Sequence, residues 1–298
     1  MKILSLFDGI SCARVALERA GITVEAYYAS EVDKYAIQIS NKNYPDIVQL
    51  GSVIEVGEVS DSKDKRHYFS QGSIDLLIGG SPCQDLSIAK NDRKGLSGER
   101  SGLFWEYVRI LKEVKPKYFI LENVNSMPKE AKAIISEALG VEPIMINASL
   151  VSAQNRKRLF WTNIPNVTQP EDRGILLRNV FNFNIERKIK LTPNLRKTKS
   201  GVAWDTSGKG YGSQQDRAYR LDGKLPTIPK SQTLTKTNVL LDDGTVVPLI
   251  VNELEKLQGL PNNYTDVLTS LNKRAETLGN AFNVDVVAHI LSFIPNKT

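Results

Sequence analysis

Residues 78–84 read Ile78-Gly79-Gly80-Ser81-Pro82-Cys83-Gln84, a glycine-containing turn that follows an apolar run and leads to a cysteine. The apolar residues before the turn predict a short buried strand at 74–78. Gly79 and Gly80 would leave the backbone open to the close approach of a ligand. A cysteine attacks as its thiolate, which requires a polar, partly open setting such as the end of a strand. Cys83 is therefore a candidate nucleophile, although a buried structural cysteine is the commoner role for this residue type.

Strand and helix patterns alternate along the chain on both sides of this stretch. Short apolar runs predict strands at 2–7, 24–29, 47–50, 74–78, 118–121, 143–147 and 159–161. Apolar residues at helical spacing predict helices at 13–20, 33–43, 102–114, 128–139, 251–257, 271–278 and 284–293. Such alternation is typical of an α/β fold built on a doubly wound, mostly parallel sheet.

Three polar sites follow strands whose carboxyl ends would share one edge of such a sheet. They are the turn Asp8-Gly9-Ile10-Ser11, Glu31 and Glu122. Gly9 would let a nucleotide-like ligand approach the backbone, and Glu31 would accept the hydroxyls of a ribose. Glu122 would lie on the same edge as Cys83, which favours a nucleophile with an acid beside it. The alternatives are a plain strand-to-helix turn at Gly9 and a helix-capping carboxylate at Glu122.

Basic residues gather directly after Cys83 and again near residue 157. The polar stretch 84–101 carries four cations, Lys90, Arg93, Lys94 and Arg100. A long polar loop beside a nucleophile is typical of a mobile lid, here with charges that suit phosphates. Arg156 and Arg158 would point to the same face of an extended run, which suits an anion or a base carbonyl.

The positive charge of the chain is concentrated in one segment. Residues 151–247 contain 17 lysines and arginines against 8 aspartates and glutamates, a net charge of +9, whereas the whole chain is +6 and the remainder is therefore −3. Short glycine- and threonine-rich pieces at 163–247 indicate a separate lobe, with aromatic and basic residues interleaved at Trp204, Tyr211, Arg217, Tyr219 and Arg220. A basic block in a slightly acidic protein indicates a polyanion partner, and the alternative is a solvated, lysine-rich surface.

Composition excludes several classes of protein. The chain has 298 residues, 41% hydrophobic and 24% charged, as in an ordinary globular protein with room for a large core and a smaller lobe. No apolar run approaches the roughly 18 residues of a membrane span, and the apolar run that follows Met1 is too short for a signal peptide. Two cysteines and two histidines give neither a metal-ligand spacing nor a disulfide framework. We expect no metal, no membrane contact and a reducing cytoplasmic setting.

The ordered set of motifs resembles the DNA cytosine-5 methyltransferases over nearly the full length. The matching pieces are Phe7-Asp8-Gly9, Ser81-Pro82-Cys83-Gln84, Glu122-Asn123-Val124, Gln154-Asn155-Arg156-Lys157-Arg158, Leu257-Gln258-Gly259-Leu260-Pro261 and Gly279-Asn280-Ala281. Local pieces are similar to the animal de novo methyltransferases, namely Phe7-Asp8-Gly9-Ile10, Ala29-Ser30-Glu31-Val32, Ile78-Gly79-Gly80-Ser81-Pro82-Cys83 and Tyr264-Thr265-Asp266-Val267.

The resemblance implies a Rossmann-like catalytic domain at 1–163 and 268–298 and a smaller, irregular, β-containing target-recognition domain at 164–267. It implies transfer of a methyl group from S-adenosylmethionine to C5 of a flipped-out cytosine in double-stranded DNA, with S-adenosylhomocysteine as product. Cys83 would attack C6, Glu122 would hold the N3 and N4 edge, and Arg158, supported by Arg156, would contact the base carbonyl or the surroundings of Cys83.

The resemblance also implies two sets of binding residues. The cofactor would be held by Phe7, Asp8, Gly9, Ile10, Ser11, Cys12, Glu31, Val32, Ser52, Val53, Pro82, Leu103, Asn280, Ala281 and Phe282. DNA would be contacted by Gln84, Lys90, Arg93, Lys94, Arg100, Arg217 and Arg220.

The chain departs from the family pattern at three places. Ser11-Cys12 stands where a second glycine is usual, so the cofactor turn would be bulkier. Ser52 stands where an aspartate often meets the adenine amino group, and Pro248-Leu249-Ile250 replaces an arginine-containing entry to the glutamine-glycine motif. None of these changes touches Cys83 or Glu122.

Three other functions fit parts of the pattern. A branch of the same family methylates cytosine in transfer RNA with the same chemistry, but the large segment at 163–248 favours duplex DNA. A catalytically silent DNA-binding relative is disfavoured by the intact Cys83 and Glu122. A nucleotide-binding oxidoreductase is disfavoured by the incomplete glycine fingerprint. We expect a monomer in the cytoplasm or on the nucleoid, with a cognate restriction endonuclease as one conceivable partner.

Overall fold

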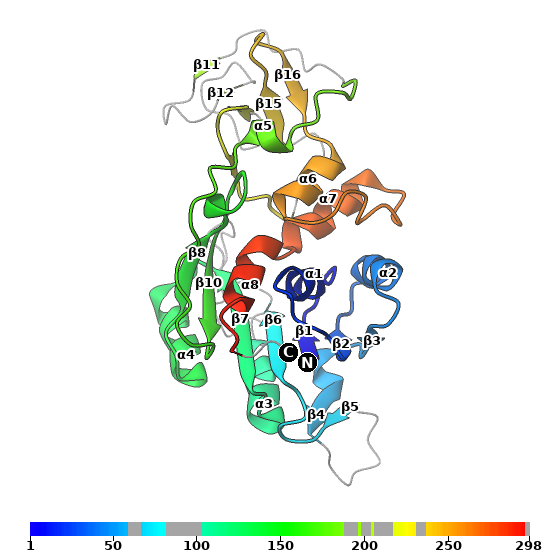
Figure 1. Ribbon diagram of the computed structural model, residues 1–298, viewed down its shortest axis with the longest axis vertical. Coiled ribbons are helices and arrows are strands. Elements are labelled where there is room, and N and C mark those ends of the chain that lie inside the picture. The colour runs from blue at the N-terminus through cyan, green and yellow to red at the C-terminus, as the bar shows by residue number, and fades with distance from the viewer. Residues whose placement is uncertain are drawn as a thin grey trace. The chain divides into compact units, whose positions relative to one another are not determined.

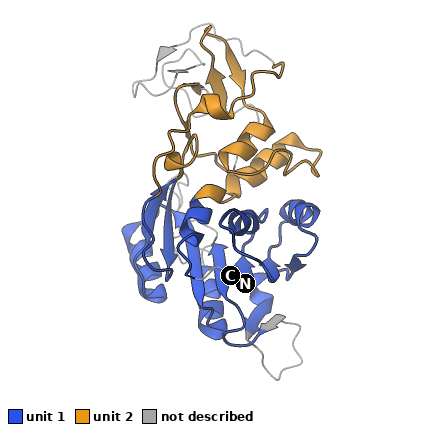
Figure 2. Ribbon diagram, in the orientation of Figure 1, with its two compact units in different colours: residues 1–147, 157–169, 286–298 blue, residues 148–156, 170–285 orange. Residues whose placement is uncertain are grey.

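The computed structural model describes residues 1–58, 67–81, 103–187, 196–197, 204–205, 217–230 and 237–295. The chain divides into two compact units, coloured separately in Figure 2. Unit 1 comprises residues 1–147, 157–169 and 286–298, and unit 2 comprises residues 148–156 and 170–285. The functional boundaries expected for a target-recognition domain, 164–267, remain a prediction.

Unit 1 is built on a seven-stranded sheet with the order β3-β2-β1-β6-β7-β10-β8 (Figure 1). Its strands are β1 (Lys2–Leu6), β2 (Ala26–Ser30), β3 (Val48–Gln49), β6 (Leu76–Gly80), β7 (Tyr118–Val124), β8 (Ile144–Asn147) and β10 (Lys157–Thr162). The five strands β3, β2, β1, β6 and β7 pair in parallel, whereas β10 is antiparallel to both β7 and β8. The prediction of a doubly wound, mostly parallel sheet is confirmed.

The strand order reverses between β1 and β6. The chain runs outward through β2 and β3 and then returns to place β6 on the other side of β1. Right-handed crossovers then put α1 (Cys12–Arg19) and α2 (Lys34–Asn43) on one face, and α3 (Phe104–Val114) and α4 (Lys129–Leu139) on the other. The carboxyl ends of β1 and β6 at such a reversal are the usual ligand-binding place in open α/β sheets.

Helix boundaries in unit 1 follow local chemistry. The Asp33 side chain accepts hydrogen bonds from the backbone N–H groups of Tyr35 at 2.8 Å and Ala36 at 3.4 Å, which caps the start of α2. Gly140, with φ of 70°, ends α4 in the left-handed conformation that glycine adopts without strain. Helix α8 (Val284–Leu291) runs from unit 2 into unit 1.

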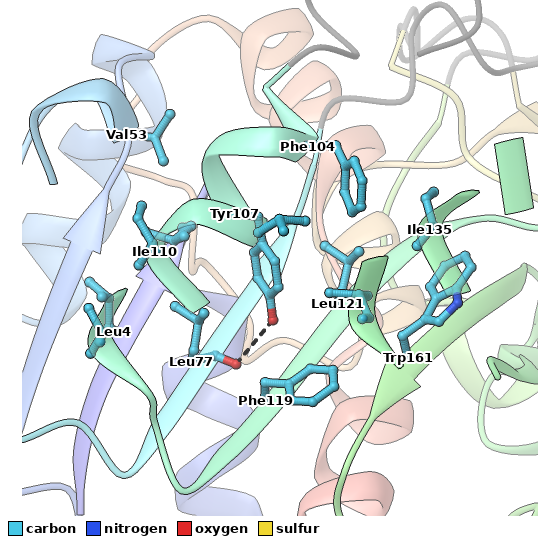
Figure 3. Packing of buried hydrophobic residues seen from close by; sticks show 14 of the residues in the cluster. Leu4, Val53, Leu77, Phe104, Tyr107, Ile110, Phe119, Leu121, Ile135 and Trp161 are labelled. Carbon is cyan, nitrogen blue, oxygen red and sulfur yellow. Dashed lines mark hydrogen bonds between the residues drawn. The ribbon is translucent and has the colours of Figure 1, made fainter. Parts of the chain in front are cut away.

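The core of unit 1 lies between the sheet and the helices α3 and α4 (Figure 3). Leu77, Leu121 and Trp161 from three neighbouring strands pack against aromatic and aliphatic side chains of the helices. The hydroxyl of the fully buried Tyr107 lies 3.0 Å from the backbone oxygen of Ile120 and 3.4 Å from that of Leu77. Burial raises the pKa of Tyr107 well above its ordinary value, so that this phenol stays neutral and joins β6 to β7.

Gly79 serves this packing, and the approach of a ligand at this position remains a prediction. A Cβ atom at Gly79 would lie 2.8 Å from the backbone oxygen of Leu6 and 3.2 Å from the ring of Tyr107. The strand therefore needs a glycine so that α3 can lie close to it. The segment 55–71, in which the sequence predicts no element, contains β4 (Val56–Glu58) and β5 (His67–Phe69), which pair in parallel.

Unit 2 contains small sheets and short helices. Its larger sheet has the order β11-β12-β13-β15-β16, formed by Arg196–Lys197, Trp204–Asp205, Arg217–Arg220, Asn238–Leu240 and Val246–Pro248. A second sheet pairs β9 (Gln154–Asn155) with β14 (Leu225–Pro226) in parallel. The helices are α5 (Leu177–Val180), α6 (Val251–Leu257) and α7 (Leu271–Asn280).

Two buried ion pairs on α6 hold unit 2 together. Glu253 accepts hydrogen bonds from Arg187 at 2.5 and 3.0 Å, and both side chains are at least 95% buried. Glu255 accepts from the hydroxyl of Thr265 at 2.6 Å and from Arg274 at 3.1 Å. Removing one partner of such a pair leaves an uncompensated buried charge, which usually costs about 3–5 kcal/mol.

Among the described residues, no helix combines the length and the apolar composition that crossing a bilayer requires.

Candidate functional site

The turn after β1 adopts an unusual backbone conformation. Phe7, Gly9 and Ser11 have φ values of 56°, 61° and 59°, so that every second residue is left-handed. Only glycine adopts this conformation freely, and each of the other two residues costs on the order of 1 kcal/mol or more. Surrounding contacts therefore hold the turn in place, and such strain is common at ligand-binding sites.

Glu31 fixes this turn from the end of β2. Its Oε2 accepts a hydrogen bond from the backbone N–H of Gly9 at 2.7 Å. Its Oε1 accepts from the N–H groups of Val32 and Asp33, both at 2.8 Å. The carboxylate is thus held in one orientation at the carboxyl edge of the sheet, where the sequence predicts a ribose contact.

Asp8 points away from this edge and into the interior of unit 1. Its Oδ1 accepts from the hydroxyl of Tyr27 at 2.6 Å and its Oδ2 from that of Ser11 at 2.5 Å, and the residue is 5% exposed. Burial raises the pKa of Asp8 from 3.8 to about 6, against the opposing effect of these hydrogen bonds. Asp8 therefore supports the turn from the interior, and its part in binding a cofactor remains a prediction.

Asp8→Asn should stabilise the protein most at neutral pH. Because the folded state has the higher pKa, Asp8 lowers stability as pH rises from about 4 to about 6, and the loss of about 3 kcal/mol persists above that range. The amide makes weaker hydrogen bonds than the carboxylate, which reduces the gain in the free energy of unfolding to about 2 kcal/mol at pH about 7.5. At pH about 4.5 the gain should be about 2 kcal/mol smaller, because Asp8 is then largely protonated in the folded wild type. Urea unfolding at both pH values tests this, and a gain that does not depend on pH would contradict it.

The next strand end carries Ser52 and a short 3-10 helix, η1 (Val53–Glu55). The hydroxyl of Ser52 accepts from the N–H of Ile54 at 3.4 Å, so that it caps η1. Val32 and Ile54 are exposed at 73% and 59%, and they follow neighbouring parallel strands. Exposed aliphatic side chains at such a position suit the faces of a flat apolar ring.

Arg109 of α3 holds η1 in place, a role that the sequence does not predict. Its guanidinium donates to the backbone oxygens of Val56 at 2.7 Å and Val53 at 3.4 Å. It also pairs with Glu106 at 2.7 Å and Glu113 at 2.8 Å. No local motif marks this residue, because its role arises only when α3 packs against η1 and β4.

Glu122 lies on β7, opposite the last residue of β6. In the parallel pairing of β6 and β7, Glu122 is opposite Gly80, three residues before Cys83. Its Oε1 lies 2.7 Å from Nε of Arg158 on β10, and both side chains are 15% exposed. The neighbouring Asn123 donates to the hydroxyl of Ser81 at 3.1 Å, which ties the ends of the two strands together.

Several predicted site residues lie outside the described part of the chain. They are Pro82, Cys83, Gln84, Lys90, Arg93, Lys94 and Arg100, together with Tyr211 of the basic lobe. Leu103 directly precedes α3 and is half-buried. Arg217 and Arg220 lie on β13, where Arg220 pairs with Asp222 at 3.2 Å and Asp242 at 3.5 Å. Their contacts with DNA remain predictions.

The two motif arginines have separate partners. Arg156 stands between β9 and β10, is 4% exposed and donates to the backbone oxygens of Ile228, Gly279 and Ala281 at 3.1, 3.2 and 2.9 Å. Arg158 on β10 pairs instead with Glu122. The expectation that both guanidiniums point to the same face remains a prediction.

The three C-terminal motifs are joined to one another inside unit 2. The backbone oxygen of Leu257 accepts from Ser152 at 2.7 Å and Asn283 at 3.0 Å. Gln258 donates to the backbone oxygen of Leu278 at 2.7 Å, while its own backbone oxygen accepts from Val284 at 2.9 Å. We call this cluster the motif hub; it consists of Ser152, Arg156, Leu257, Gln258, Leu278, Gly279, Asn283 and Val284. Asn280 is exposed, Ala281 buried and Phe282 half-buried, and their part in the cofactor site remains a prediction.

No group of three or more histidines, cysteines, aspartates or glutamates within the described ranges is placed to hold a metal ion.

Several known proteins with similar sequences or folds are methyltransferases by name. The family model for C-5 cytosine-specific DNA methylase matches residues 1–238. Type II methyltransferase M.NgoBV of Neisseria gonorrhoeae is 31% identical over an alignment of 317 positions, which covers 90% of this chain and 71% of that protein. Orphan methyltransferase M.SPRI of Bacillus phage SPR is 35% identical over 174 residues, 55% of this chain but only 38% of the phage protein. The methyltransferase EhMeth of Entamoeba histolytica has the same fold, with a TM-score of 0.69, 17% identity and coverage of 98% and 97% of the two chains.

Proposed function

Because the chain belongs to the C-5 cytosine-specific DNA methylases, as its motifs predict, we propose that it methylates C5 of cytosine in double-stranded DNA with S-adenosylmethionine. The observation that carries this proposal is the position of Glu122. This carboxylate is paired with Arg158 and lies opposite Gly80, where β6 ends and the chain continues to Cys83. A nucleophile and an acid at neighbouring strand ends are what the reaction requires.

The carboxyl edge of unit 1 fits the cofactor. The left-handed turn at Gly9 leaves open space around its Cα, since a Cβ atom there would meet nothing within 4 Å. Glu31 is held in place to accept ribose hydroxyls, and Val32 and Ile54 offer apolar surface to the adenine ring. Ser52 is a weaker partner for the adenine amino group than a carboxylate would be. When bound, S-adenosylmethionine supplies the methyl group that is transferred.

The residues of the chain would then act on a cytosine turned out of the duplex. The thiolate of Cys83 would form a bond to C6, which moves electron density to C5 and makes that carbon nucleophilic. Glu122 would hold the N3 and N4 edge and offset the negative charge that enters the ring. Arg158 would hold the Glu122 carboxylate in position through the contact at 2.7 Å. Loss of the C5 proton to water and of the Cys83 sulfur from C6 would restore the aromatic ring.

Glu122→Gln should lower the rate of methyl transfer by about 10²-fold, the usual scale for a positioned proton donor. The amide keeps the shape of the side chain, so binding of DNA and cofactor should change much less. Single-turnover kinetics with saturating DNA measure the effect. Glu130→Gln, at an exposed position on α4, is the matched control and should leave the rate unchanged. Equal rates for the two variants would remove Glu122 from the mechanism.

Positive charge in the segment 84–101 and in the basic lobe supports DNA as the partner. Phosphate contacts position a protein on DNA and base contacts select the sequence, so the two regions should differ in effect. We assign phosphate binding to the segment 84–101 and sequence choice to 164–267. Replacing Lys90, Arg93 and Lys94 by alanine should weaken binding to all duplexes alike and reduce the salt slope by roughly one for each lost phosphate contact. A weakened affinity with an unchanged salt slope would contradict the assignment to 84–101.

The proposed substrate is tested by incubation with radiolabelled S-adenosylmethionine and either duplex DNA or transfer RNA. We expect label in 5-methyl-2′-deoxycytidine after digestion of the DNA and none in the nucleosides of the RNA. Label in RNA alone would establish the tRNA enzyme instead. No label in either, with intact DNA binding, would indicate the catalytically silent relative.

A further inference from the structure

Asp8 is the charged group of the cofactor turn that the proposed mechanism does not use. Its carboxylate is almost fully buried, and each oxygen accepts a hydrogen bond from a neutral hydroxyl, Tyr27 on β2 and Ser11 after the turn. The hydroxyl of Ser11 lies 2.6 Å from that of Ser40 on α2, and Ser40 in turn lies 3.2 Å from the side-chain nitrogen of Gln49 on β3. Asp8 thus lies at the end of a chain of uncharged polar groups that extends through Ser11 to α2 and β3.

The charged neighbours of Asp8 do not compensate its charge. Glu31, which raises its pKa, is another carboxylate and accepts from the N–H of Gly9 beside it. Arg14 on α1 is directed to Glu18 at 3.9 Å and Asp46 at 3.5 Å. Two carboxylates therefore act on one turn, and the pKa of about 6 shows that the interior holds the Asp8 charge only at a cost. A cation bound at the turn would offset this cost, and a neutral ligand would not.

We propose that Asp8 is a selectivity residue that favours the positively charged sulfonium cofactor over the neutral thioether product. The inference rests on the proposed function, since it concerns S-adenosylmethionine and S-adenosylhomocysteine as ligands of the turn. The two molecules share their adenosine and amino-acid groups and differ by the methyl group and one positive charge. Attraction between opposite unit charges at an effective dielectric of about 20 is large enough to change affinity by roughly tenfold. The buried carboxylate thereby favours replacement of the product by a new molecule of cofactor after each methyl transfer.

The test is calorimetric binding of each ligand to wild type and Asp8→Asn at pH about 7.5, without DNA. The ratio of S-adenosylmethionine affinity to S-adenosylhomocysteine affinity should fall about tenfold in the variant, while affinity for S-adenosylhomocysteine changes less than about twofold. An analogue with a protonated amine in place of the sulfonium should lose affinity as S-adenosylmethionine does. Asp33→Asn, which removes an exposed carboxylate from the next turn, is the control and should leave the ratio unchanged.

A pH series on the wild type gives a second test that needs no substitution. The affinity ratio should fall as pH drops through about 6 and Asp8 becomes protonated. An unchanged ratio in Asp8→Asn, equal loss of both ligands, or a ratio that does not vary with pH would overturn the selectivity role. If wild type binds none of the three ligands, the cofactor assignment fails first, so the two failures are distinguishable.

Discussion

Cys83→Ser should abolish methyl transfer while leaving the binding of DNA and S-adenosylmethionine within about twofold of wild type. The alcohol keeps the size of the side chain, but at neutral pH it is a far weaker nucleophile than a thiol, a fraction of which is ionised. Without the bond to C6, C5 of cytosine has too little electron density to accept a methyl group. Cys83 lies outside the described residues, so this prediction rests on the motif and on the position of Glu122 beside the end of β6.

The measurement is incorporation of labelled methyl groups into duplex DNA, with binding isotherms for DNA and cofactor recorded on the same preparation. Retained binding shows that the variant is folded, so that loss of turnover reports on chemistry. A serine variant that methylates at a rate comparable with wild type would show that the nucleophile is another residue. Loss of binding together with turnover would show instead that Cys83 is a structural residue.

Gly279→Ala should destabilise unit 2 by about 3 kcal/mol. A Cβ atom at this position would lie 2.1 Å from the backbone oxygen of Pro229 and 2.6 Å from its carbonyl carbon. These obstacles are backbone atoms, so the end of α7 and the segment at 228–230 must move apart. The movement would also stretch the hydrogen bonds that Arg156 donates to Ile228, Gly279 and Ala281.

Urea unfolding followed by circular dichroism measures this effect. Glu276→Ala, on the same helix and paired with Lys273 at 2.8 Å across partly exposed side chains, is the control and should change stability by less than about 0.5 kcal/mol. An unchanged midpoint for Gly279→Ala would mean that the motif hub is loosely packed. In that case the glycine would have to be explained by a ligand.

The sequence predicts the central sheet well because its signals are local. Apolar runs and helical spacing depend on neighbouring residues, so strands β1, β2, β3, β6 and β7 and helices α1 to α4 lie close to their expected positions. The direction of β10 cannot be read in this way, since an apolar strand has the same pattern in either orientation. The separate partners of Arg156 and Arg158 cannot be read in this way either, since they arise from contacts with residues distant in the sequence.

Residues of the site could be predicted where a sequence motif marks them. They could not be predicted where only tertiary packing brings them to the site. Glu31 directly follows β2, and Glu122, expected just after a strand, lies two residues before the end of β7, so the strand pattern alone is enough to find both. Arg109, Tyr27 and Ser40 carry no motif, yet they hold the turns at the carboxyl edge through contacts across the fold. The inward orientation of Asp8 is likewise a property of the left-handed turn, in which Phe7, Gly9 and Ser11 reverse the direction of the chain.

The central claim is that catalysis proceeds through a covalent bond between Cys83 and a cytosine of duplex DNA. The most direct measurement uses DNA that contains 5-fluorocytosine, incubated with the protein and S-adenosylmethionine and analysed under denaturing conditions. Fluorine at C5 cannot leave as the proton does, so the adduct should persist after methyl transfer. We predict a denaturant-resistant complex whose cross-linked peptide carries the methylated base on Cys83. A protein that methylates ordinary DNA but forms no such complex, or forms it through a different residue, would contradict the account.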